Sequence, residues 1–145
     1  MEPTWILVAD SARARLFTVE RPRGPLNEHA DYVNPADRLR DQDLETDAPG
    51  RGARSGGGGR YSMGGDTGTK DHYAQRFARD LADVLQKGRA AHKFRRLYVM
   101  AAPNFLGALR GFMDPPTAAC VVGSYAKDVV REKPDGIRKH LPYRL

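Results

Sequence analysis

A short apolar run near the start of the chain, TWILVAD at residues 4–10, restricts the fold more than any other feature. Its β-rich composition is typical of a strand covered on both faces. RARLFTVE at 13–20 follows so closely that we predict a hairpin turning between Asp10 and Arg13. LNEHADYVN at 26–34 alternates loosely and predicts a third strand after the turn residues RPRGP. Three neighbouring strands joined by short turns indicate an antiparallel meander.

The most strongly patterned segment is TKDHYAQRFARDLADVLQKG, residues 69–88, which predicts a helix. Apolar side chains recur in it at the spacing i, i+4, i+8, i+11 and i+12, which places them on one helical face. The expected ends follow from capping preferences, with a hydroxyl or carboxylate at the start and glycine at the stop. The apolar face is Tyr73, Phe77, Leu81, Val84 and Leu85, and the end signals are Thr67 or Thr69, Asp71 and Gly88.

Four more elements complete the predicted fold. RRLYVMAA at 95–102 predicts a buried strand, NFLGALRGFM at 104–113 a short helix opened by Pro103 or Asn104, TAACVVGSYA at 117–126 a last strand, and KPDGIRKHL at 133–141 a closing helix. The order is β-β-β-α-β-α-β-α. It predicts one α/β domain over residues 1–145 with a mixed five-stranded sheet, an order that resembles the ribonuclease H-like arrangement.

Between the third strand and the long helix lies an insertion at about residues 34–68 with no periodic apolar pattern. Residues 34–48 contain five acids and two arginines, whereas residues 49–68 contain nine glycines and three arginines against one aspartate. So many glycines are costly to order, and we expect a mobile loop. A phosphate-binding P-loop or a dinucleotide fingerprint would require a preceding strand and different residues after the glycines. A weaker anion contact and a simple surface excursion both stay open.

The sequence does not assemble a catalytic or metal site. Cys120 is the single cysteine, it lies in an apolar run, and we expect a buried, inert thiol. The four histidines are scattered without ligand spacing. Asp10 ends the first strand, yet the strand ending in VMAAPN supplies no second carboxylate for a two-metal mechanism, so Asp10 is expected to shape the hairpin turn. No cofactor is predicted.

The charge of the chain favours an acidic partner. Twenty-four Lys and Arg against 18 Asp and Glu give a formal net charge of +6, which suits nucleic acid and equally suits simple solubility. The N-terminal residues do not resemble a signal peptide, and no apolar stretch is long enough for a membrane span, so we expect a cytoplasmic protein without membrane contact.

Three segments together resemble the bacterial host-attachment protein family: WILVADSARARLF, GRYSMGGDTGTKDHYAQRFARDLADVL and LYVMAAPNFLGALR. This family is similar to the central domain of archaeo-eukaryotic peptide-release factors. The resemblance implies a ribonuclease H-like α/β fold with a glycine-rich loop before a long helix. In release factors the loop tip is Gly-Gly-Gln, but here Gly64-Gly65 is followed by Asp66, and no glutamine lies between Gln42 and Gln75. The hydrolysis of peptidyl-tRNA therefore has no residue to carry it in this chain.

The resulting hypothesis is a non-catalytic, release-factor-like domain that contacts RNA or the ribosome. Basic residues of the loop and helix would pair with phosphates, and a tyrosine would stack on a base or pack the loop onto the domain. Two alternatives remain: a hydrolase of an RNA or nucleotide ester using Asp10 or Asp66, and a protein-interaction module using the acidic segment 37–47 and the basic loop. The predicted nucleic-acid-binding residues are Arg51, Arg54, Arg60, Tyr61, Lys70, Arg76 and Arg79.

Overall fold

The computed structural model describes residues 3–36 and 55–145, with side chains described in 3–36 and 71–145. Five strands and four helices are assigned in this part of the chain. The strands are β1 (Thr4–Ala9), β2 (Arg13–Val19), β3 (Asn27–Val33), β4 (Arg96–Ala101) and β5 (Val121–Tyr125). The helices are α2 (Ser55–Ala90), α3 (Pro103–Phe112), α4 (Pro115–Ala119) and α5 (Pro134–Lys139).

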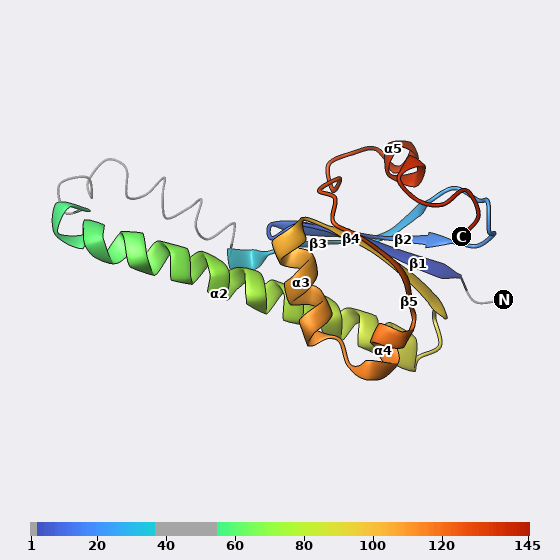
Figure 1. The fold of residues 1–145 in the computed structure, drawn as a ribbon, viewed down its shortest axis with the longest axis horizontal. Helices are drawn as coiled ribbons and strands as arrows, with labels where there is room; N and C mark the ends of the chain where they lie inside the picture. Colours follow the sequence, from blue (N-terminus) through green and yellow to red (C-terminus); the bar gives the residue numbers. More distant parts are fainter. Residues whose placement is uncertain (1–2, 37–54) are drawn as a thin grey trace.

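The strands form one mixed sheet in the order β3-β2-β1-β4-β5, shown in Figure 1. β1 pairs with β2, and β2 with β3, in antiparallel fashion, which confirms the predicted meander. β1 pairs with β4, and β4 with β5, in parallel, so Trp5 lies opposite Thr18 on one side and Leu97 on the other. The five-stranded mixed α/β sheet is confirmed.

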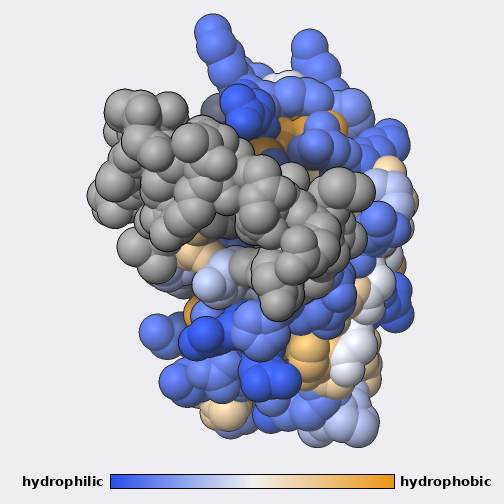
Figure 2. All heavy atoms as spheres, turned by 90° about the vertical axis from the view of Figure 1, so that its left-hand side faces the viewer, coloured by the Kyte–Doolittle hydropathy of each residue, from blue (hydrophilic) through white to orange (hydrophobic). Residues whose placement is uncertain are grey.

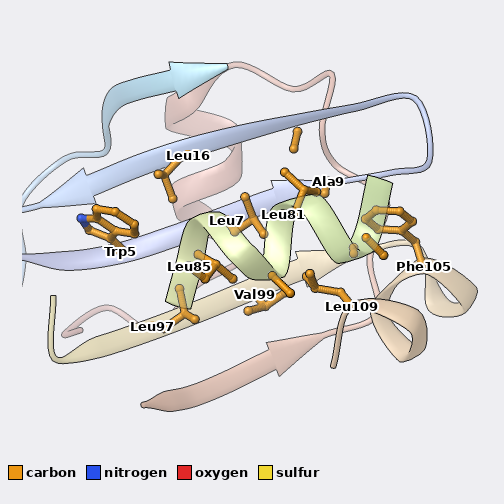
Figure 3. Close-up of a cluster of buried hydrophobic side chains, with 14 of the residues drawn as sticks. Trp5, Leu7, Ala9, Leu16, Leu81, Leu85, Leu97, Val99, Phe105 and Leu109 are labelled. Carbon is orange, nitrogen blue, oxygen red and sulfur yellow. The ribbon is translucent and has the colours of Figure 1, made fainter. Parts of the chain in front are cut away.

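Both faces of the central strands β1 and β4 are covered, as their apolar runs predicted, whereas β3 at one edge of the sheet is largely exposed. In β1 and β4 every residue after the first is buried. α2 and α3 pack together and cover one face, and α5 lies on the other (Figure 1). The face under α2 holds Trp5, Leu7, Leu81, Leu85, Leu97 and Leu109 among its buried side chains (Figure 3). The predicted apolar face is thus largely correct, with Phe77, Leu81 and Leu85 buried and Tyr73 and Val84 half-buried.

The layer on the opposite face is held by arginine as well as by apolar packing. Arg15 of β2 donates Nη1 to the carbonyls of Val130 at 2.8 Å and Glu132 at 2.6 Å. Arg138 of α5 donates to four carbonyls, among them Gly24 at 3.1 Å from Nε; the others are Pro22, Pro142 and Tyr143. These bonds tie the irregular C-terminal segment to β2 and to the turn after it.

α2 begins much earlier than predicted. Its first residue is Ser55, so the backbone of residues 55–68 is helical and Thr67, Thr69 and Asp71 lie inside the helix. Each glycine in a helix costs about 1 kcal/mol relative to alanine. Propagation from an already packed helix still adds one hydrogen bond per residue, and this extends the helix into the glycine-rich segment. The rest of the predicted loop, residues 37–54, lies outside the described residues, and its predicted mobility is not tested.

Gly88 does not end α2, contrary to the prediction. The helix continues to Ala90, and His92 takes the left-handed conformation with φ of 58°. His92 donates its backbone N–H to Arg89 O, and Lys93 donates to Gly88 O, both at 2.9 Å. This is the Schellman pattern, in which His92 occupies the position that usually favours glycine. Gly88 is buried inside the helix, and glycine is needed there because a Cβ would lie 2.6 Å from the Trp5 ring.

The segment predicted as the last strand contains a short helix first. Asp114 caps α4 by accepting the backbone N–H of Thr117 at 2.9 Å, and proline follows the cap, so residues 115–119 turn helically before β5 begins. Hydrogen bonds from the side chain and then the backbone of Thr117 lower the pKa of Asp114. Cys120 lies at this junction and is only half-buried, so the prediction of a buried thiol is wrong.

Candidate functional site

The first candidate surface is the part of α2 that extends past the sheet. The helix has 36 residues and is therefore about 54 Å long, and its early turns project beyond the strands (Figure 1). Of the predicted phosphate-binding residues, Arg51 and Arg54 lie outside the described residues. Arg60, Tyr61 and Lys70 have described helical backbone but no described side chain.

Arg76 and Arg79 are the predicted site residues whose side chains are described. Both are exposed, and both lie on α2 where it leaves the sheet. The guanidinium of Arg79 lies 5.2 Å from the centre of the Phe112 ring, a cation–π distance that steadies the side chain while leaving its edge in solvent. Where Figure 2 colours this face, it is mostly hydrophilic with a few apolar patches.

The root of this projection is the β1–β2 hairpin. Asp10 Oδ1 accepts the backbone N–H groups of Ala12 at 2.8 Å and Arg13 at 2.9 Å, which closes the turn. Asn34 is buried beside it and donates Nδ2 to the carbonyls of Ser11 at 2.9 Å and Tyr73 at 3.4 Å. The hairpin, the end of β3 and α2 are therefore joined by one amide side chain.

Asp10 thus has the turn-shaping role that the sequence predicted. One of its oxygens is occupied by two backbone donors, an arrangement that stabilises a turn. Among the described side chains, no group of three His, Cys, Asp or Glu residues could hold a metal ion. Within the same part of the chain, no helix is long and apolar enough to cross a bilayer.

A charged cluster lies on the outer strands. Arg15 forms a two-pronged ion pair with Glu28, with both N–O distances 3.0 Å. The hydrogen bonds from Arg15 and then Asp31 lower the pKa of Glu28 from 4.5 to about 2, and the bond to Glu28 raises the pKa of Asp31. Because Arg15 also holds the C-terminal segment, the cluster is a structural clamp rather than a reaction site.

The second candidate surface is at the opposite end of the sheet, around the first residues of β1 and β4. A groove of about 1020 Å³ opens there, and Trp5 and Val19 contribute apolar lining. The loop after α2 separates it from a smaller pocket of about 620 Å³ that contains Cys120. His92 and Arg95 line both.

A comparison with protein families shows which family this chain belongs to. A family model described as "Protein required for attachment to host cells" matches residues 5–141, from β1 through α5. The chain belongs to this family. A comparison with curated proteins finds no match.

The three segments that resemble the host-attachment family all lie within the matched range, and the fold brings them together. The first forms the β1–β2 hairpin, the second forms most of α2, and the third forms β4 and α3. They meet in one buried cluster, where Phe77 of α2 lies 5.9 Å from Phe105 of α3, measured between ring centres, with Ala9 in the same cluster. The family pattern therefore marks the α2 layer of the domain.

The groove was missed in the sequence, although a signal was present. HKFRR at residues 92–96 interleaves three cations with an aromatic residue, a pattern typical of anion-binding surfaces. Its partner residues, Arg21 and His29, come from other elements and show no sequence relation to it. Only the fold brings them together.

Proposed function

We propose that this host-attachment family protein is a cytoplasmic, non-catalytic, release-factor-like domain that contacts RNA or the ribosome. The glycine- and arginine-rich segment and the basic start of α2 form the contact surface. The observation that carries the proposal is the projection of α2 beyond the sheet, with Arg76 and Arg79 exposed at its root.

The topology supports the release-factor likeness. An antiparallel β3-β2-β1 unit followed by parallel β4 and β5 is consistent with a ribonuclease H-like sheet. A helix that projects beyond one end of the sheet is well placed to reach into a groove of a large partner. Backbone phosphates attract arginine strongly, and such contacts position a protein without reading sequence.

The chemistry of release is left out of the proposal. Asp66 follows Gly64-Gly65 where a release factor has glutamine, and a carboxylate at a phosphate-rich surface is repelled. The effect on attachment that names the family would then be an indirect consequence of an activity inside the cell.

Co-sedimentation with ribosomes at about 50 and 200 mM salt tests the proposal. We expect binding of the intact chain at low salt and a steep loss at high salt. The double substitution Arg76→Gln and Arg79→Gln removes two phosphate contacts. The dependence of log K on log salt should therefore become less steep, by roughly 1.4 in slope for contacts to single-stranded RNA. A chain lacking residues 50–66 should lose most of the binding.

A charge-matched control is available in Lys127→Gln with Arg131→Gln, two exposed cations outside α2. This double variant should sediment like the intact chain. Equal loss in both double variants would show only a response to net charge, and no sedimentation of the intact chain at low salt would refute the proposal.

A further inference from the structure

The groove at the amino ends of β1 and β4 has a rim of unusual charge. Four cationic side chains line it, against the single side-chain carboxylate of Glu20 and the two imidazoles of His29 and His92. The four cations are Arg21, Lys93, Arg95 and Arg96. A concave surface with this imbalance concentrates anions.

The position of these cations is not explained by the end of α2 alone. The carboxyl end of a helix favours nearby cations, which accounts for Lys87 and Arg89 in the last turn. Arg21, however, comes from the turn after β2, and Arg96 begins β4. Cations from three separate elements therefore converge on one groove.

The wall of the groove near these cations is aromatic and rigid. Trp5 stacks on Phe94 with ring centres 4.6 Å apart and planes inclined by 29°. The ring centre of His29 lies 5.9 Å from that of Trp5, and His29 is exposed whereas Trp5 is buried. Gly88 packs beneath the indole without room for a methyl group. The packed Trp5 and Phe94 rings support the exposed imidazole of His29, which is the aromatic surface that a flat group can contact in this groove. A preorganised contact of this kind reduces the entropy lost on binding.

His92 adds a backbone feature to the same place. A residue other than glycine with φ of 58° costs of order 1 kcal/mol relative to glycine. With histidine there, an imidazole lines the boundary between the groove and the neighbouring pocket.

We propose that this groove binds a nucleotide, with its phosphate between Arg21 and Lys93 and its base against the exposed imidazole of His29. Ligand sites of this kind combine a largely apolar lining with a few charged groups, and the groove is large enough to hold such a molecule. The same chemistry is offered by a free mononucleotide and by the phosphorylated end of an RNA strand. The site is separate from the α2 surface, so it stands or falls independently of the proposed function.

The single tryptophan of the chain lines this groove, so its fluorescence reports binding there. Emission excited at the red edge of the tryptophan band is followed during titration with adenosine monophosphate, adenosine and inorganic phosphate. We expect saturable quenching by adenosine monophosphate, at least tenfold weaker binding of the other two, and weakening by salt. An RNA oligonucleotide with a 5′-phosphate that competes, when its dephosphorylated form does not, identifies a strand end as the ligand; competition by neither assigns the site to free nucleotides.

Arg21→Gln with Lys93→Gln should weaken binding at least tenfold, whereas the control Lys127→Gln with Arg131→Gln leaves it unchanged. His92→Gly should raise the melting temperature while weakening binding, a combination that loss of folding cannot produce. Absence of a saturable change in Trp5 emission with adenosine monophosphate at millimolar concentration overturns the proposal. Equal binding by the Arg21/Lys93 variant overturns it as well.

Discussion

Replacing Gly88 by alanine separates the two roles that a glycine near a helix end can have. If Gly88 served only to end α2, alanine would be a better helix former at this position and would stabilise the protein by about 1 kcal/mol. In the structure α2 continues past Gly88, and the glycine lies against the Trp5 ring. We therefore expect destabilisation.

The size of the effect follows from the contact distances. A Cβ at position 88 would lie 2.6 Å from two atoms of the Trp5 ring and 3.3 Å from Phe94. Carbon atoms pack best at about 3.5–4.0 Å, so the indole would have to move by about 1 Å. Phe94 is stacked on that indole and resists the movement. Overpacking of this kind costs about 1–3 kcal/mol, and after the gain of about 1 kcal/mol in helix propensity we expect a net loss of up to about 2 kcal/mol.

Thermal and urea unfolding measure this difference, with Trp5 fluorescence as a local probe. For a chain of this size 1 kcal/mol shifts the melting temperature by about 2–4 °C, so we expect a melting temperature lower by up to about 8 °C. Gly107→Ala is the matched control, because Gly107 lies inside α3 and a Cβ there would meet nothing within 4 Å. The control should stabilise by about 1 kcal/mol. If Gly88→Ala stabilises the protein as Gly107→Ala does, the close packing of α2 on Trp5 is refuted.

Two further predictions concern carboxylates. The pKa of Glu28 is lowered to about 2 in the folded state, so its contribution to stability is complete above the usual pKa of 4.5 and is lost as the pH falls toward 2. Between pH 5 and 2 the free energy of unfolding of Glu28→Gln should therefore fall less steeply than that of the original protein. An unchanged slope would contradict the clamp with Arg15. Asp10→Ala should cost about 1 kcal/mol, whereas Asp10→Asn keeps an acceptor oxygen for both turn N–H groups and should cost less. A metal-dependent hydrolysis lost in Asp10→Asn would instead favour the hydrolase alternative.

The sequence predicted most elements, because periodicity is a local property. The strands, the meander and the buried stripe of α2 follow from patterns within single segments. The start of α2 could not be predicted, since glycine propensity argues against a helix that extends from a packed portion. Gly88 was wrongly predicted to end the helix, because the side chain that requires glycine there belongs to Trp5, more than eighty residues away. The groove was missed for the same reason, because Arg21 and Lys93 line one groove only through the pairing of the strands.

The arginine bonds to main-chain carbonyls have a consequence for the behaviour of the protein in acid. Neither arginine nor a peptide carbonyl titrates in the range where carboxylates become protonated. When Glu28 is neutralised, Arg15 still holds Val130 and Glu132, and Arg138 keeps its four acceptors. Acidification should therefore break the side-chain bond between Arg15 of β2 and Glu28 of β3 first, while the C-terminal segment remains packed on the sheet. The order of opening is built into the choice of acceptor, and amide hydrogen exchange at low pH would show β3 exchanging before α5.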